Sequence, residues 1–155
     1  MTVPYLDTPS GWDRVVHVIR EKGVCGWDSE TYGHEVDEST PVGRAKVHVW
    51  SLAVSTRAVS PRGHHVAAGV VLPAAALGYG PLVALLEDPA VAKWAWNAPH
   101  DVHSAREHGV IVRGWVDGLP LARVALPGLP RHGLKTVGPH LTGKPMTDYK
   151  TTLTM

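Results

Sequence analysis

Two carboxylates stand two positions apart at the end of a short apolar stretch. Asp28 and Glu30 follow residues 24–27, which are β-prone, and alternate side chains of a strand point to the same face. Such a pair repels itself unless a cation lies between the two groups, and Mg²⁺ or Mn²⁺ prefers oxygen ligands of this kind. Taken alone, the pair is also compatible with a solvated strand end that leads into the acidic segment 35–38.

A second polar segment follows a later apolar stretch. Asn97 lies at the end of a predicted strand, and Asp101 lies in the first turn of the helix predicted next, where the helix dipole favours an anion. Taken alone, Asn97 is equally an N-cap and Asp101 a surface residue that complements the dipole. Considered together, the two segments favour one shared site.

The predicted elements form an α/β domain with a mixed sheet. The pattern predicts a helix from the N-cap Ser10 to Lys22, and Asp117 as the N-cap of a later helix. The other predicted elements are strands at 24–29, 46–55, 65–72, 91–96 and 110–116, and helices at 80–87, 99–108, 119–125 and 133–141. An antiparallel meander followed by alternating strands and helices implies helices flanking a mixed sheet. A length of 155 residues predicts a single domain.

These motifs resemble those of the DEDD superfamily of 3′-to-5′ exonucleases. Gly26–Thr31 is similar to their first motif, Asp-x-Glu-Thr, and Asn97-x-x-x-Asp101 is similar to their second. Segments 115–123 and 131–137 look like the Asp-Thr-x-x-x-Ala and His-x-Leu-x-x-Leu segments of the proofreading domains of family A DNA polymerases. The resemblance covers residues 8–150 and implies a ribonuclease H-like fold.

The resemblance implies catalysis by two divalent cations, Mg²⁺ or Mn²⁺. Two such ions stabilise the attacking and leaving oxygens of phosphodiester hydrolysis, while carboxylates hold the ions. By resemblance, Asp28 would bridge both ions, Glu30 would serve the ion that activates water, and Asp101 would serve the ion on the leaving-group side.

The expected substrate is the 3′ end of single-stranded DNA. Thr31, Tyr32, Asn97 and His103 are the candidate contacts: Tyr32 would stack on a base, Asn97 would steady the nucleotide or the local turn, and His103, or alternatively His108, would touch a phosphate. A polymerase is a further expected partner, and a membrane is not.

The third motif of the family has no counterpart in this sequence. It supplies the fourth carboxylate on a final helix, as Tyr-x-x-x-Asp or His-x-x-x-x-Asp. Here the corresponding positions after Tyr149, His132 and His140 are Leu153, Val137 and Pro145. We therefore expect residues 1–155 to be an exonuclease-like domain without its last helix. Loss of a catalytic base or water-orienting residue costs about 10²- to 10⁴-fold in rate.

The tryptophans and the cysteine are assigned mainly to structure, and the histidines do not predict a zinc site. The tryptophans should mainly replace phenylalanine, which is absent, in the core, and at most one or two of them are candidates for stacking on a base; they are Trp12, Trp27, Trp50, Trp94, Trp96 and Trp115. Cys25 is expected to be an inert buried thiol. His100, His103 and His108 lie on one predicted helix, but their spacing does not match a zinc site.

Composition and charge favour a globular protein of the cytoplasm. Apolar residues make up 44% and charged residues 19% of the chain, so a packed core can form. Residues 1–40 carry a net charge of −5 and residues 41–155 of +6, which suits a cation site beside a polyanion. The apolar stretches are too short for a membrane span. One cysteine and no signal sequence predict a reducing cytoplasm, that of the host if the gene belongs to a bacteriophage.

Three hypotheses follow. The first is a metal-dependent 3′–5′ exonuclease that is impaired as an isolated chain. The second is a catalytically silent relative that binds nucleic acid or protein. The third is a split exonuclease, in which another chain supplies the missing motif.

Overall fold

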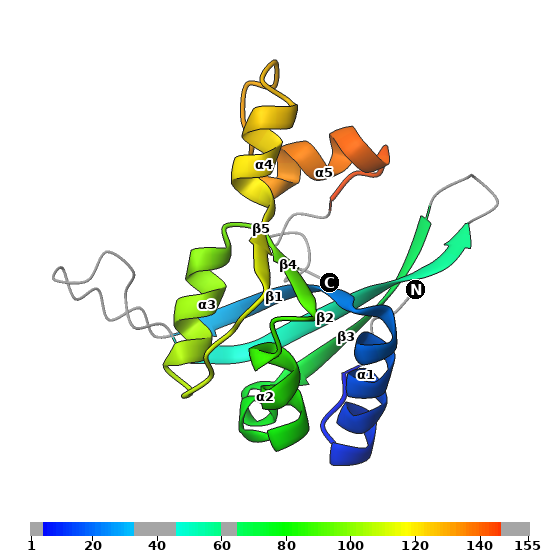
Figure 1. Cartoon of the computed structure of the whole chain (residues 1–155). Coiled ribbons are helices and arrows are strands. Elements are labelled where there is room, and N and C mark those ends of the chain that lie inside the picture. The colour runs from blue at the N-terminus through cyan, green and yellow to red at the C-terminus, as the bar shows by residue number, and fades with distance from the viewer. Residues whose placement is uncertain (1–4, 33–45, 60–64, 147–155) are drawn as a thin grey trace, which may run out of the picture. The chain divides into compact units, whose positions relative to one another are not determined.

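The computed structural model describes residues 5–32, 46–59 and 65–146 (Figure 1). The contacts within the chain divide it into two compact units, Met1–Asp117 and Gly118–Met155. Among the described residues, no helix combines the length and the apolar character that crossing a membrane requires.

The first unit contains a five-stranded mixed sheet, as the sequence predicts. Its strands are β1 (Val24–Tyr32), β2 (Lys46–Val59), β3 (His65–Pro73), β4 (Ala92–Ala95) and β5 (Trp115–Asp117). The strand order is β3-β2-β1-β4-β5. The β1–β2 and β2–β3 pairs are antiparallel, and the β1–β4 and β4–β5 pairs are parallel.

Three α-helices and a 3₁₀ turn accompany the sheet. They are α1 (Pro9–Lys22), η1 (Ala74–Gly78), α2 (Gly80–Glu87) and α3 (Ala98–Arg106). Helix α1 has a proline in its first turn and ends at Gly23, which has φ 69°, a left-handed conformation that glycine adopts without a steric penalty. Its buried residues recur at helical spacing, so one apolar stripe of α1 packs on the protein interior.

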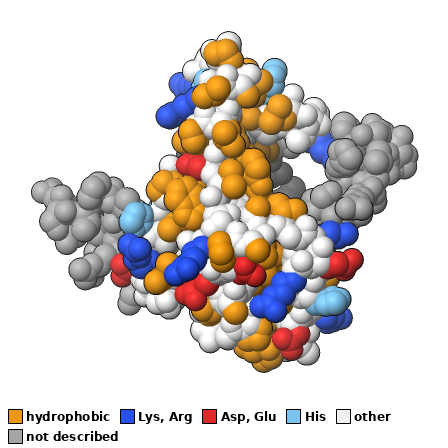
Figure 2. All heavy atoms as spheres, in the orientation of Figure 1, with side chains coloured by type: hydrophobic (Ala, Val, Ile, Leu, Met, Phe, Trp, Pro, Cys, Tyr) orange, Lys and Arg blue, Asp and Glu red, His pale blue; other side chains and the backbone are white. Residues whose placement is uncertain are grey.

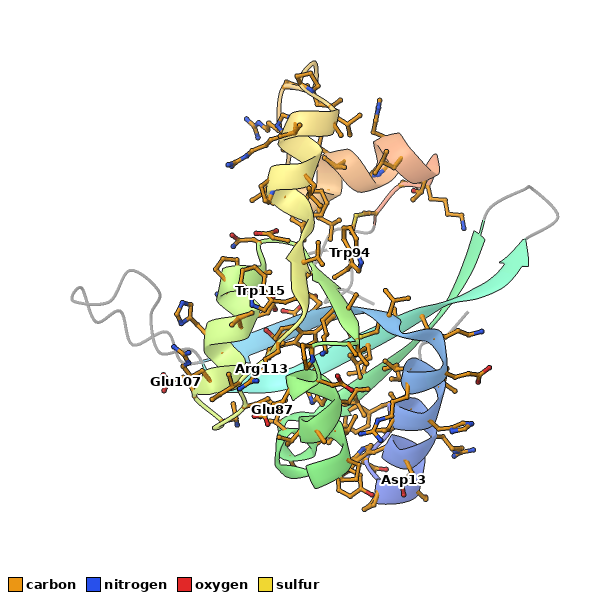
Figure 3. All side chains as sticks on the ribbon, in the orientation of Figure 1. Asp13, Glu87, Trp94, Glu107, Arg113 and Trp115 are labelled. Carbon is orange, nitrogen blue, oxygen red and sulfur yellow. The ribbon has the colours of Figure 1, made fainter. Side chains whose placement is uncertain are left out.

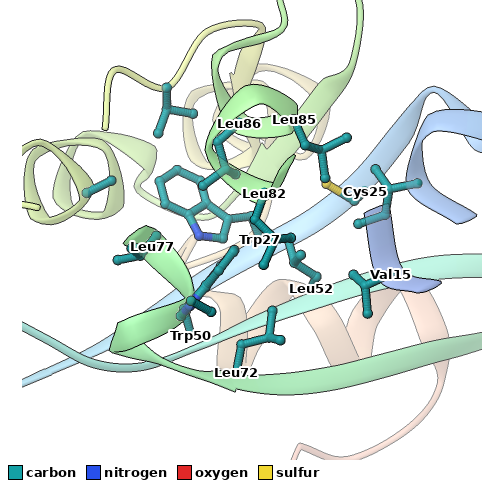
Figure 4. Close-up of a cluster of buried hydrophobic side chains, with 14 of the residues drawn as sticks. Val15, Cys25, Trp27, Trp50, Leu52, Leu72, Leu77, Leu82, Leu85 and Leu86 are labelled. Atoms are coloured by element: carbon teal, nitrogen blue, oxygen red, sulfur yellow. The ribbon is translucent and has the colours of Figure 1, made fainter. Parts of the chain in front are cut away.

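The hydrophobic core joins the sheet to these helices (Figure 4). Residues Cys25 and Trp27 of β1, Leu52 of β2 and Leu72 of β3 are buried with the apolar faces of α1 and α2. The burial alternates along β1, so the residues between Cys25, Trp27 and Ser29 lie on the other face of the sheet. On the surface drawn in Figure 2, positive and negative side chains are interspersed.

Several predicted boundaries are wrong by a few residues. Helix α1 follows Thr8, which makes no side-chain cap, so Ser10 is not the N-cap. The strand predicted at 110–116 is formed only at Trp115–Asp117. Gly114, just before it, has φ 65°, and a Cβ there would lie 2.7 Å from the carbonyl oxygen of Val91. Because the backbone at Gly114 passes so close to Val91, pairing with β4 begins only after Gly114.

The prediction that the tryptophans mainly form the core is confirmed for three of the six. Trp12, Trp27 and Trp50 are buried, but Trp94 and Trp115 are 45% and 43% exposed, and Figure 3 labels both. Their strands, β4 and β5, lie at one end of the strand order, and the two side chains lie on opposite faces, because Trp115 pairs with Lys93, the neighbour of Trp94. Cys25 is buried as predicted.

The second unit contains two short helices among its described residues. They are α4 (Gly118–Ala125) and α5 (Leu134–Thr142), in agreement with the predicted helices within about one residue. Helix α5 ends at Gly143, which has φ 66°, and the His132 ring is within hydrogen-bond distance of the Leu126 carbonyl, at 2.8 Å.

Candidate functional site

Parallel pairing brings the two polar segments to one edge of the sheet. Strands β1 and β4 run in the same direction, so their carboxyl ends lie together. Asp28 and Glu30 lie near that end of β1, and β4 leads through Asn97 into α3, whose first turn contains Asp101. The carboxyl ends of parallel strands are a common place for ligand sites in α/β proteins.

Hydrogen bonds tie Asp101 to β1. The Ser29 backbone N–H donates to Asp101 Oδ1 at 2.9 Å, and the Ser29 hydroxyl donates to the same oxygen at 2.6 Å. Asp101 is only 2% exposed, and buried carboxylates need such donors. The structure therefore joins the two segments that the sequence separates by 72 positions.

Asp28 and Glu30 share one face of β1, as predicted. Both are exposed, whereas Trp27 and Ser29 are buried on the opposite face. Trp94 lies across from Gly26 in the parallel ladder, on the face that Asp28 and Glu30 occupy, because paired residues point the same way.

The three carboxylates interact electrostatically. The pKa of Asp28 is raised to about 6, first by partial burial of its carboxylate and then by repulsion from Asp101 and Glu30, while His100 opposes the shift. Burial also raises the pKa of Asp101, and the Ser29 hydrogen bonds and His100 lower it. Mutual repulsion of this kind is what a bound cation would relieve.

The turn between β4 and α3 depends on Asn97. Its φ of 63° makes it the one non-glycine residue with positive φ among the described residues, and asparagine tolerates this conformation better than most residues. Asn97 is at the N-cap position of α3 without a side-chain cap. Instead, its backbone N–H donates to Asp117 Oδ1 at 2.9 Å. The sequence predicts Asp117 only as a helix N-cap and does not predict this contact with Asn97.

The donor chemistry of Asp28, Glu30 and Asp101 fits a hard divalent cation. All three provide carboxylate oxygens, the ligands that Mg²⁺ and Mn²⁺ prefer, and among the described residues His100 is the one positive partner that lowers the pKa of Asp28. In the part of the chain that the structure describes, no three His, Cys, Asp or Glu side chains are arranged to hold a metal as they stand. A cation would therefore require local adjustment of these side chains.

The predicted substrate contacts remain predictions. Thr31 and Tyr32 are the last residues of β1, and their side chains lie outside the described part of the structure. A shift in the β1–β2 register falls between Glu30 and Thr31. His103 is exposed on α3.

Sequence reasoning missed two residues of this site. Ser29 was not a candidate, although its place between Asp28 and Glu30 predicts a side chain on the opposite face. His100 acts on both Asp28 and Asp101, and its only sequence signal was its position next to Asp101.

Comparison with solved structures finds the same fold in nucleases. Brucella melitensis NrnC with bound Mg²⁺ is similar with a TM-score of 0.67 and 18% identity, covering 96% of this chain and 65% of that one. Escherichia coli RNase D, an exoribonuclease involved in structured RNA processing, gives 0.66 and 17%, covering 97% and 36%. Trypanosoma brucei RNase D in complex with RNA U12 gives 0.68 and 18%, covering 99% and 52%. The sequence matches no family model, and no curated protein matches it.

These similarities confirm the predicted fold. At 17–18% identity they concern the architecture, which is a ribonuclease H-like mixed sheet flanked by helices. The chain spans between about one third and two thirds of the length of these three structures. It therefore has the fold of known nucleases, while the likeness to polymerase proofreading domains stays a prediction.

Proposed function

We propose that this chain is a metal-dependent exonuclease that hydrolyses phosphodiester bonds from the 3′ end of a single-stranded nucleic acid. The observation that supports the proposal is the pair of hydrogen bonds from Ser29 to Asp101, which tie Asp101 to the strand that carries Asp28 and Glu30, where burial and then repulsion raise the pKa of Asp28. The fold shared with nucleases supports it.

In this proposal the three carboxylates hold divalent cations, Mg²⁺ or Mn²⁺. A bound cation would activate water and stabilise charge on the phosphate oxygens. Asp28 is the central ligand, because it interacts with both Glu30 and Asp101. Asn97 maintains the turn that presents Asp101, and Thr31, Tyr32 and His103 contact the nucleic acid.

The choice between DNA and RNA as the substrate is a second part of the proposal. The family resemblance favours the 3′ end of DNA, whereas two of the similar structures are named for RNA processing or bound RNA. Matched DNA and RNA oligonucleotides of one sequence distinguish the two.

The test is cleavage of 5′-labelled single-stranded oligonucleotides with Mn²⁺ or Mg²⁺. We expect a ladder of products shortened one nucleotide at a time, inhibition by EDTA, and protection by a 3′-terminal phosphate. Asp28→Ala should lower the rate at least about 100-fold, because even residues that only orient metal ligands contribute 10- to 100-fold. Asp13→Ala is the matched control, since Asp13 lies on α1 and bonds Tyr79. Cleavage that persists in Asp28→Ala would contradict the proposal.

A second candidate function is a binding module or one part of a split exonuclease. It is favoured by the arrangement of the described His, Cys, Asp and Glu side chains, no three of which are placed to hold a metal as they stand. Oligonucleotide binding without cleavage, measured by fluorescence anisotropy, supports a binding module. Cleavage that returns when a helical peptide with Tyr-x-x-x-Asp is added supports a split enzyme.

A further inference from the structure

Ser29 stands between the two exposed carboxylates of β1 but faces the other way. Asp28 and Glu30 are exposed, while Ser29 is 8% exposed, because successive side chains of a strand alternate. The tripeptide therefore presents two carboxylates on one face and a hydroxyl donor on the other.

Ser29 meets Asp101 where the β1–β4 ladder has ended. The last paired residues are Gly26 and Trp94, and beyond them β4 turns away into α3. At that position the Asp101 carboxylate accepts the Ser29 backbone N–H, which a strand would otherwise pair. The carboxylate thus replaces β4 as the hydrogen-bond partner of β1.

The hydroxyl adds a second, short hydrogen bond. Ser29 Oγ lies 2.6 Å from Asp101 Oδ1, a separation typical of a hydroxyl that donates to a charged carboxylate, and such bonds are stronger than neutral ones. Two donors from one residue therefore restrict both the position and the rotation of Asp101.

We infer that Ser29 is a positioning residue for the metal site: its two hydrogen bonds hold the Asp101 carboxylate against β1, the strand that carries Asp28, from where a local adjustment of side chains lets both carboxylates share a divalent cation. The inference rests on the proposed function, since it assigns Ser29 to the same site. Groups that orient metal ligands usually contribute 10- to 100-fold to metal affinity.

The experiment measures Mn²⁺ binding directly, by electron paramagnetic resonance titration of the whole chain. Ser29→Ala removes the hydroxyl and keeps the backbone N–H, and we expect Mn²⁺ affinity to fall about 10-fold. Ser29→Thr keeps a hydroxyl and should restore affinity to within about threefold of the unmodified chain, because its oxygen can donate in the same way.

Ser104→Ala is the matched control. Ser104 is 3% exposed on α3, the helix that carries Asp101, and its hydroxyl donates to the His100 carbonyl at 2.9 Å. The Ser104→Ala variant therefore loses one buried serine hydroxyl but keeps both hydrogen bonds of Asp101. Its Mn²⁺ affinity should change less than about twofold, as expected for a residue that is not involved in the metal site. Urea denaturation verifies that each variant is folded. If Ser29→Ala does not fold, Ser29→Cys replaces the hydroxyl with a weak S–H donor and should show the same loss.

The outcomes separate this inference from the proposed function. Unchanged Mn²⁺ affinity in folded Ser29→Ala or Ser29→Cys overturns the inference, as does an equal loss in Ser104→Ala, and neither result affects Asp28-dependent cleavage. If only the Ser29 variants lose Mn²⁺ affinity and neither they nor the unmodified chain cleaves the oligonucleotide, the inference is supported and the proposed exonuclease function is wrong. Failure of the unmodified chain to bind Mn²⁺ overturns both.

Discussion

Lys93 and Asp101 are buried ionisable residues on consecutive elements, and they differ in the groups that surround their charges. Lys93, on β4, is 0% exposed, and its Nζ donates to the backbone carbonyls of Asp88 and Arg113. Asp101, on α3, accepts two hydrogen bonds from Ser29. The first charge is held by neutral carbonyls of a loop, whereas the second lies among other carboxylates.

The difference separates a structural charge from the one that we propose to be functional. Burial lowers the pKa of Lys93, while nearby Cys25 and Asp88 favour its charged form, so its surroundings already compensate it. Asp101 is held by the Ser29 donors, but it repels Asp28, whose pKa is raised first by burial and then by Asp101 and Glu30. Perturbed, like-charged groups of this kind are typical of functional sites.

The largest expected effect comes from Asp101→Asn. The amide keeps the shape and can still accept from Ser29, but it removes the charge that a cation needs. Because metal catalysis contributes several kcal/mol to such reactions, we expect oligonucleotide cleavage to fall at least about 1000-fold. Asp13→Asn, an exposed hydrogen-bonded aspartate on α1 (Figure 3), should retain full activity. If Asp101→Asn retains more than about a tenth of the cleavage activity, the assignment of Asp101 as a functional charge is wrong.

Lys93→Met should affect stability and not metal binding. The substitution leaves the partly buried carbonyls of Asp88 and Arg113 without their Lys93 donor, at a cost of about 1 kcal/mol in the free energy of unfolding. Urea denaturation measures this loss. Arg113→Met, at an exposed side chain, should change stability by less than about 0.5 kcal/mol. A folded Lys93→Met with stability unchanged, or with Mn²⁺ affinity lost, contradicts the structural role of Lys93.

The smallest effect is the pH dependence that Asp28 confers on the metal-free protein. Its pKa is about 6 in the folded state, above the ordinary 3.8, so the folded state binds this proton more tightly. The stabilisation of the folded state by protonated Asp28 is present below pH 3.8 and is lost as the pH rises through about 6.

We therefore expect Asp28→Asn to equal the unmodified chain in stability near pH 4 and to exceed it at pH 7 in EDTA. The gain should be on the order of 1 kcal/mol or less, because solvent screens an exposed carboxylate. Denaturation in urea across this pH range measures it. A variant that is less stable than the unmodified chain at pH 7 would mean that Asp28 is not under repulsion.

Local patterns in the sequence were sufficient for most of the fold. Apolar spacing and glycine stops predicted α1, α2 and the β1–β2–β3 meander with errors of a few residues, since these signals depend on neighbours along the chain. The same alternation placed Asp28 and Glu30 on one face of β1. The strand predicted from 110 to 116 failed because pairing with β4 begins only after Gly114, where the backbone passes close to Val91.

What the sequence by itself determined, then, was which residues share a strand face or a helix turn. Tertiary structure alone decided that Ser29 bonds Asp101, that Asp117 bonds the backbone of Asn97, and that Lys93 donates to the Arg113 carbonyl. These contacts join residues 20 to 72 positions apart, and side-chain periodicity carries no information over such separations. They depend on the parallel pairing of β1, β4 and β5, which brings the ends of the three strands together.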